Sequence, residues 1–148
     1  MSTKVLGWRE WVSLPAFGLA AVRAKVDTGA RTSALHVDWQ EMFHRDGVEW
    51  VRFGLHPADV AAPGSAVEAP VFARRPVTDS GGHVGERVFI RTRMELAGLV
   101  FDAEINLTSR RAMRFPMLLG RTALANRFAV DPARSFVLGE PPGEDSKS

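Results

Sequence analysis

The residues best suited to chemistry stand at the end of an alternating stretch, in the tetrapeptide Asp27-Thr28-Gly29-Ala30. An aspartate at this place can be held in a tight turn by backbone N–H groups, while the glycine permits close backbone approach and the threonine supplies a hydroxyl. The same residue types are expected in an ordinary Asx turn. Two interpretations therefore stand side by side, a catalytic carboxylate and a structural turn.

A second segment, Phe115-Pro116-Met117-Leu118-Leu119-Gly120-Arg121, lies far downstream of the first. Val26-Asp27-Thr28-Gly29-Ala30 and Leu118-Leu119-Gly120-Arg121 together resemble the retropepsin-like aspartic proteases. That family pairs a hydrophobic-Asp-Thr-Gly-Ala sequence with a later hydrophobic-hydrophobic-Gly-Arg sequence, which packs beneath the catalytic loop and opens a helix. The resemblance favours the catalytic interpretation of Asp27.

Longer runs narrow the resemblance to the RimB family within these proteases. They are residues 7–12, 24–36 and 106–124, and in several blocks the resemblance covers about residues 7–138. Members of this family are often labelled ATP-dependent zinc proteases and are associated with ATP-grasp ligases that append glutamates. The resemblance therefore implies a functional link to an ATP-grasp glutamate ligase.

The resemblance also implies a fold. We expect a mainly β chain that forms a small closed β-barrel of the retropepsin (acid protease) type, with one short helix near the C-terminus. Residues 1–139 are expected to form a single retropepsin-like domain, and residues 140–148, which are rich in Pro, Gly and charge, a disordered tail.

Aspartic protease chemistry uses two carboxylates that share one proton across a water molecule. The chain holds one Asp-Thr-Gly sequence, so a homodimer that contributes Asp27 twice is the direct solution. By resemblance, Thr28 braces the two loops and Gly29 helps hold the carboxylates near coplanar. The function implied is hydrolysis of peptide bonds by an aspartic endopeptidase.

The residue after the tetrapeptide departs from the retroviral pattern, which has an acid that pairs with the later arginine. This chain has Arg31 there, so Arg31 and Arg121 are both cationic. Either Asp38 or Asp131 compensates, or the cleft carries positive charge suited to glutamate-rich peptides or glutamate-tailed proteins.

The substrate is expected to contact Ala30, Arg31 and Arg121 and to be covered by a flap. The glycine-rich residues 80–85 are the candidate flap, with Gly82 and His83 at the substrate; a plain connecting loop is the other interpretation.

Two other classes of function stay open. One is a peptide-binding or adaptor domain that keeps the fold without turnover. The other is a zinc metallopeptidase, although the chain has no H-E-x-x-H sequence and its four histidines are scattered, at His36, His44, His56 and His83. No phosphate-binding G-x-x-x-x-G-K-[ST] loop is present either, and we expect neither a metal nor a cofactor.

Period-two alternation predicts the strands that position these residues. It marks residues 20–26, a β-hairpin over 87–107 that turns at Ala97-Gly98, and an inward face at Val51, Phe53 and Leu55. A short helix is expected over 121–126. Residues 57–86 are rich in Pro and Gly, which predicts loops or an irregular hairpin.

Composition sets the broad class. The chain has 148 residues, 45% of them hydrophobic, no cysteine, and 19 Lys and Arg against 17 Asp and Glu. It is long enough for one core, it lacks an apolar run that could cross a membrane, and its N-terminus lacks the apolar core of a signal peptide. We expect a cytoplasmic protein with a peptide or protein substrate and without nucleic-acid or membrane partners.

Overall fold

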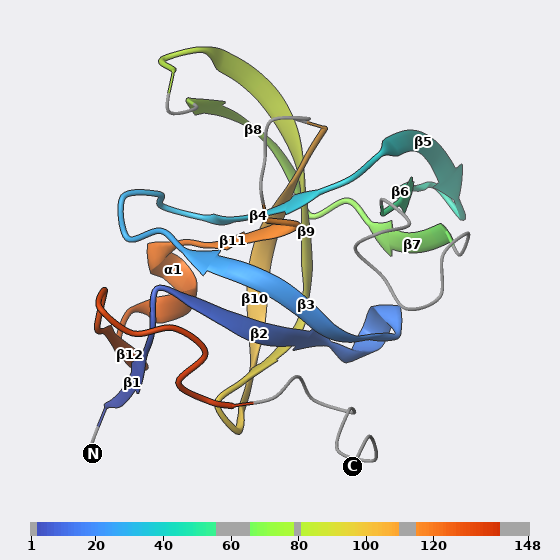
Figure 1. The fold of residues 1–148 in the computed structure, drawn as a ribbon. Coiled ribbons are helices and arrows are strands. Elements are labelled where there is room, and N and C mark those ends of the chain that lie inside the picture. Colours follow the sequence, from blue (N-terminus) through green and yellow to red (C-terminus); the bar gives the residue numbers. More distant parts are fainter. Residues whose placement is uncertain (1–2, 56–65, 79–80, 110–114, 140–148) are drawn as a thin grey trace.

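The computed structural model describes residues 3–55, 66–78, 81–109 and 115–139, and these are mostly strands (Figure 1). A four-residue α-helix and a 3₁₀ turn at Pro15–Phe17 complete the secondary structure of the described residues. The elements are β1 (Lys4–Leu6), β2 (Arg9–Leu14), β3 (Leu19–Val26), β4 (Ser33–His36), β5 (Trp39–Arg45), β6 (Val48–Gly54), β7 (Ala66–Pro70), β8 (Ala73–Thr78), β9 (Val84–Leu96), β10 (Leu99–Thr108), β11 (Met117–Leu119), α1 (Arg121–Leu124) and β12 (Phe128–Val130).

The largest sheet has seven strands in the order β10-β4-β11-β3-β2-β9-β8, and β9 also pairs with β10. Following the paired strands from β10 through β4, β11, β3, β2 and β9 therefore leads back to β10. The contact between β2 and β9 is short, because these strands share a single registered pair, Ser13 opposite Glu95. The expectation of a mainly β chain with one short helix is confirmed, whereas a closed barrel stays a prediction.

The alternating stretches form the strands that the sequence predicts. Val22, Ala24 and Val26 of β3 are buried, and so are Val51, Phe53 and Leu55 of the second predicted face. They join one continuous core to which most of the strands contribute.

The predicted β-hairpin is confirmed as β9 and β10, which pair in antiparallel register from Leu96–Leu99 outward. Both turn residues have positive φ, 56° at Ala97 and 79° at Gly98. This is the geometry of the two-residue turn whose twist matches that of the strands.

Of the two structures predicted for residues 57–86, loops or an irregular hairpin, loops are wrong in part, because residues 66–70 and 73–78 are strands, and residues 73–78 form a hairpin with β9. β7 pairs with β6 in a three-stranded sheet of order β5-β6-β7, and β8 pairs with β9. Each is an edge strand, where a proline such as Pro70 or Pro76 costs no ladder hydrogen bond. Residues 56–65 and 79–80 lie outside the described residues.

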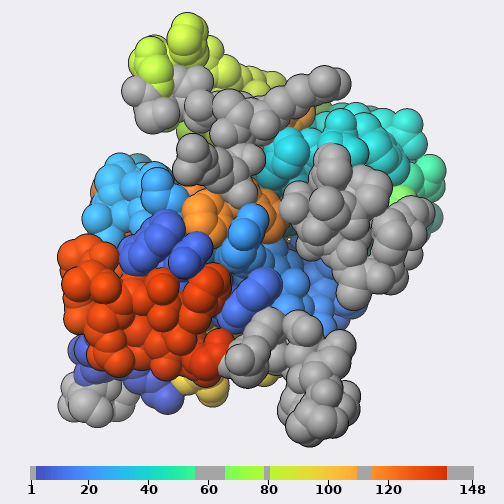
Figure 2. Space-filling model, in the orientation of Figure 1, coloured from blue at the N-terminus to red at the C-terminus, as the bar shows by residue number. Residues whose placement is uncertain are grey.

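A buried carboxylate holds the C-terminal segment against the start of the chain. Glu10 of β2 is fully buried and accepts hydrogen bonds from the backbone N–H groups of Gly7 (2.7 Å), Val137 (3.0 Å) and Leu138 (3.3 Å). The Trp11 and Phe136 rings stack nearby, with centroids 5.5 Å apart. In Figure 2 the red C-terminal residues accordingly lie against the blue N-terminal ones.

The helix expected over residues 121–126 ends two residues earlier, at Leu124, and extended structure resumes at β12 as expected. Within the described part of the chain, no helix is long and apolar enough to cross a membrane. The tail predicted for residues 140–148 lies outside the described residues.

Candidate active site

Asp27 stands directly after β3, where the strand leaves the sheet. Its backbone N–H donates to the carbonyl oxygen of Leu119 (2.9 Å), and its own carbonyl accepts from the Ala30 N–H (3.2 Å). The carboxylate accepts from the Gly29 N–H (3.0 Å), which closes an Asx turn. Asp27 is half-buried, while Thr28 and Gly29 are exposed. The turn therefore fixes the carboxylate at the surface rather than enclosing it.

The downstream segment packs against this turn from below. β11 lies between β3 and β4, parallel to the first and antiparallel to the second. The Gly120 N–H donates to the buried hydroxyl of Ser33 (3.1 Å), and a Cβ at Gly120 would overlap the backbone of Thr32. Only glycine lets the two segments approach this closely.

The start of α1 completes the brace. The backbone N–H groups of Arg121 and Thr122 donate to the carbonyls of Ala30 (2.8 Å) and Arg31 (3.0 Å). The Arg121 guanidinium donates through Nη1 to the carbonyl oxygens of Thr28 and Gly29, both at 3.1 Å. Arg121 thus binds the backbone of the Asp27 turn, although no charged partner of its guanidinium is found within the described residues.

Asn106 of β10 links the Asp27 segment to the hairpin above it. Its side-chain amide donates to the hydroxyl of Thr32 (3.2 Å) and the carbonyl of Ser33 (2.9 Å), and its oxygen accepts from Arg87 (3.0 Å). The sequence places Asn106 on the outward face of its strand, yet the side chain is buried, and β4 pairs with β10 at this end. The sequence analysis did not predict this role. The available signal was that an amide, Asn106, follows the acids Asp102 and Glu104 on the same face of the strand.

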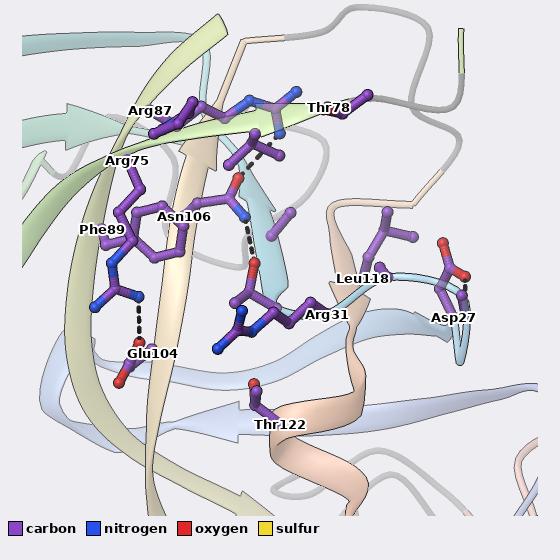
Figure 3. Close-up of a pocket in the computed structure, with 16 residues that line it drawn as sticks. Asp27, Arg31, Arg75, Thr78, Arg87, Phe89, Glu104, Asn106, Leu118 and Thr122 are labelled. Carbon is purple, nitrogen blue, oxygen red and sulfur yellow. Dashed lines mark hydrogen bonds and ion pairs between the residues drawn. The ribbon is translucent and has the colours of Figure 1, made fainter. Parts of the chain in front are cut away.

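A cleft of about 600 Å³ opens beside Asp27. Its floor comes from the Asp27 segment and β10, and its other wall from β8 and β9 (Figure 3). The charged lining residues that the structure describes are Asp27, Arg31, Arg75, Arg87 and Glu104. Glu104 pairs with Arg75 across the cleft, Nη1 to Oε1 2.9 Å.

The structure brings some of the predicted site residues together and leaves others apart. Asp27, Gly29, Ala30 and Arg31 line the cleft. The other predicted residues, Thr28, Gly82, His83 and Arg121, are exposed but are not among its lining residues. Their roles stay predictions.

The candidate flap, residues 80–85, covers the last part of the connection between β8 and β9 and the first two residues of β9, and its Ser80 lies outside the described residues. Gly82 has a φ of 83°, and His83 is exposed directly before β9. The described residues of this hairpin that line the cleft lie on its arms, Arg75–Thr78 on β8 and Arg87 and Phe89 on β9. Figure 1 shows the hairpin projecting beyond the rest of the fold.

The predicted neutralisation of the two arginines by Asp38 or Asp131 is not found within the described residues. Asp131 uses its side chain to accept from the Ala133 N–H (3.0 Å) in a turn of its own. Arg31 is exposed and lines the cleft.

The histidines of the zinc alternative are dispersed. His36 ends β4, His44 lies on β5 and His83 precedes β9, while His56 lies outside the described residues. No group of three or more His, Cys, Asp or Glu side chains that could hold a metal occurs in the part of the chain that the structure describes.

Comparison with known families places this geometry in context. A model of the RimB-like family, described as the retropepsin-like aspartic endopeptidase RimB, matches residues 5–141. Among solved structures, the chain is similar to a Legionella pneumophila protein of unknown function (DUF785). The TM-score is 0.77 at 27% identity, covering 93% of this chain and 100% of that chain.

Curated relatives carry a different name. The chain is 40% identical over 141 residues to a Desulfotalea psychrophila protein named "Probable alpha-L-glutamate ligase", and 39% identical over 137 residues to a Shewanella halifaxensis protein of the same name. These matches cover 95% and 92% of this chain but 30% of each relative. The chain therefore spans about a third of the length of the relatives it matches.

Proposed function

This chain belongs to the RimB-like family of retropepsin-like aspartic endopeptidases, and from that premise we propose that it hydrolyses peptide bonds with water activated by two Asp27 carboxylates. The observation that carries the proposal is the Asp27 turn. It presents a carboxylate to a cleft while β11 and α1 hold its backbone from below. The ring of strands, in this proposal, is a closed barrel of the retropepsin type within one domain of residues 1–139.

The mechanism needs two carboxylates with one proton between them. The ionised carboxylate takes a proton from water as the water oxygen bonds to the scissile carbonyl carbon, and the protonated carboxyl donates its proton to the carbonyl oxygen. The first carboxyl then passes its proton to the amide nitrogen, the C–N bond breaks, and a proton of the diol returns to the second carboxylate. The reaction starts with one carboxylate ionised and the other protonated, so activity is expected to follow a bell-shaped dependence on pH.

The second carboxylate comes from a second copy of the chain. Glu104 is the other acid among the described lining residues, and it pairs with Arg75. Because the Thr28-Gly29 side of the turn is exposed, two turns can meet there about a two-fold axis. Thr28 would brace the paired turns and Gly29 would set the carboxylates side by side.

Specific activity is expected to fall on dilution in proportion to the dimer fraction, because a monomer holds half of the catalytic pair. Sedimentation velocity at the assay concentrations measures that fraction. A monomer with full activity would contradict the proposal and point to a second carboxylate in the same chain, with Glu104 tested before Asp102 or Asp131.

The proposed flap is the β8–β9 hairpin, with Gly82 and His83 near its tip. Its arms already form one wall of the cleft, so a modest movement of the tip would cover a bound peptide. The peptide would then contact Ala30 and Arg31 on the opposite side, with Arg121 at the end of the turn.

The proposed substrates are glutamate-rich peptides or glutamate-tailed proteins. Three arginines and two acids line the cleft among the described residues, so its charge suits an acidic chain. The relatives named as ligases are about three times longer than this chain and contain a similar segment. The proposal therefore includes a functional link to an ATP-grasp glutamate ligase in the cytoplasm, with this domain removing what the ligase adds.

Arg31→Gln is expected to lower kcat/KM about tenfold on a glutamate-rich peptide, because a charge-assisted hydrogen bond to a substrate carboxylate is lost. The kcat/KM on the glutamine counterpart of this peptide should stay unchanged. Lys25→Gln is the matched control, an exposed cation on β3 outside the cleft lining. Equal losses on both peptides with a lower unfolding midpoint would show instead that Arg31 supports the turn.

A further inference from the structure

The end of the cleft away from Asp27 holds a charge arrangement that hydrolysis does not use. Arg75 of β8 and Arg87 of β9 are direct cross-strand partners, and both line the cleft. Resting on the proposed function, we propose that this arginine pair is a subsite for a substrate carboxylate. Glu104 pairs with Arg75 in the structure, and the substrate carboxylate would take its place.

The register of the hairpin explains why an anion belongs here. Directly opposite side chains of an antiparallel pair share a face, and like charges at such positions repel. Glu104 supplies such an anion to Arg75 at 2.9 Å, and the amide oxygen of Asn106 accepts from Arg87 at 3.0 Å. A substrate carboxylate at Arg75 would take over the contact that Glu104 makes and would accept charge-assisted hydrogen bonds from the guanidinium.

Arg75 is held in place by groups other than Glu104. Its guanidinium carbon lies 5.1 Å from the centroid of the Phe89 ring and 5.8 Å from that of Phe72. These cation–π contacts persist when Glu104 moves. The binding group is therefore positioned before substrate arrives, which limits the entropy lost on binding.

The internal pair is easy to exchange. The side chains of Arg75 and Glu104 are 46% and 35% exposed, and exposed ion pairs contribute about 0–1 kcal/mol. Glu104 also has a second cation within its reach, because Arg91 is its direct cross-strand partner on β9. The displaced carboxylate can thus turn from Arg75 to Arg91.

Position in the cleft separates this subsite from the chemistry. In Figure 3 the Arg75–Glu104 pair lies at one end and Asp27 at the other, and the Arg31 side chain extends between them. A peptide cleaved at Asp27 and running along the cleft would bring a side chain remote from the cleaved bond to Arg75. Arg75 would select the substrate without touching the reacting atoms.

The test measures binding without turnover, by calorimetry in Asp27→Asn protein at physiological salt with a glutamate-rich peptide and its glutamine counterpart. Arg75→Gln is expected to weaken binding of the acidic peptide about tenfold. Glu104→Gln is expected to tighten it about threefold, because the internal competitor is gone. Neither change should affect the glutamine peptide, and Glu104→Gln should have no effect once Arg75 is replaced.

Arg74→Gln is the matched control. Arg74 adjoins Arg75 on β8, is absent from the cleft lining, and pairs with Glu49 of β6. The hydrogen bond from Arg74 holds the pKa of Glu49 below its usual value, so this ion pair is formed at neutral pH. The variant removes the same charge and the same kind of contact, and it should leave both peptides unaffected.

Two results would overturn the subsite. One is that Glu104→Gln binds the acidic peptide no more tightly than the parent protein does. The other is that Arg75→Gln changes the affinity for both peptides equally, or changes neither. Arg75→Lys guards against a folding defect, since it keeps the charge and should retain part of the selectivity. If the wild type hydrolysed the acidic and glutamine peptides equally well, the subsite would be excluded and the proposed hydrolysis kept. If it bound the acidic peptide selectively but cleaved neither peptide, the proposed hydrolysis would be excluded and the subsite kept.

Discussion

Asp27→Asn is expected to abolish peptide hydrolysis, with kcat reduced at least about 10³-fold, while the thermal unfolding midpoint stays close to that of the wild type. An asparagine cannot take or give the proton that the mechanism needs. Its side-chain oxygen can still accept the hydrogen bond from the Gly29 N–H, which is 3.0 Å from the carboxylate in the wild type. The variant therefore removes the proton transfer and keeps the geometry of the turn.

Asp131→Asn supplies a matched control for this variant. Asp131 also closes an Asx turn, in which its carboxylate accepts from the Ala133 N–H at 3.0 Å, and it lies outside the cleft lining. Both variants should unfold alike, and Asp131→Asn should keep full activity.

Mixing the variant with wild-type protein tests the paired carboxylates directly. Excess Asp27→Asn chains should convert active dimers to inactive heterodimers and lower the activity of a fixed amount of wild type. Activity that survives in the pure variant would exclude the aspartic mechanism. A wild type that binds peptides but never cleaves them would favour the peptide-binding or adaptor interpretation.

Local alternation predicted most of the framework because one face of each strand is buried and the other is not. The β9–β10 hairpin and the Asp27 turn after β3 followed from the order of apolar and polar residues alone. The hydrogen bond from Gly120 to Ser33 joins residues 87 apart in sequence. Periodicity gives no signal for it, and the resemblance to a family implied only that the downstream segment packs beneath the Asp27 loop.

The features that the sequence did not predict depend on how strands far apart in the chain are arranged in the sheets. Pro70 and Pro76 suggested loops, yet each sits on an edge strand where a missing N–H costs little. Asn106 alternates with the outward acids but is buried, and its amide donates to Thr32 and Ser33 at the start of β4. The meeting of Arg75 with Glu104 joins residues 29 apart on strands that are not paired with each other.

Gly120→Ala is expected to have the largest effect on stability, lowering the free energy of unfolding by about 3 kcal/mol and the unfolding midpoint by about 10 °C. The added methyl group would overlap the carbonyl carbon, oxygen and Cα of Thr32. Backbone cannot rotate away as a flexible side chain can. The neighbouring Arg31 carbonyl is also held by the Thr122 N–H at 3.0 Å, so relief requires the Asp27 segment and α1 to separate.

Gly85→Ala is the control for the chemical change itself, since a Cβ at Gly85 meets no atom within 4 Å and its φ is not positive. It should shift the midpoint by less than about 2 °C. Denaturant titrations followed by tryptophan fluorescence give both free energies. If the two alanine variants proved equally stable, the contact between Gly120 and Thr32 would not be what closes the brace beneath Asp27. If Gly120→Ala kept activity despite lower stability, the position of the Asp27 carboxylate would not depend on that brace.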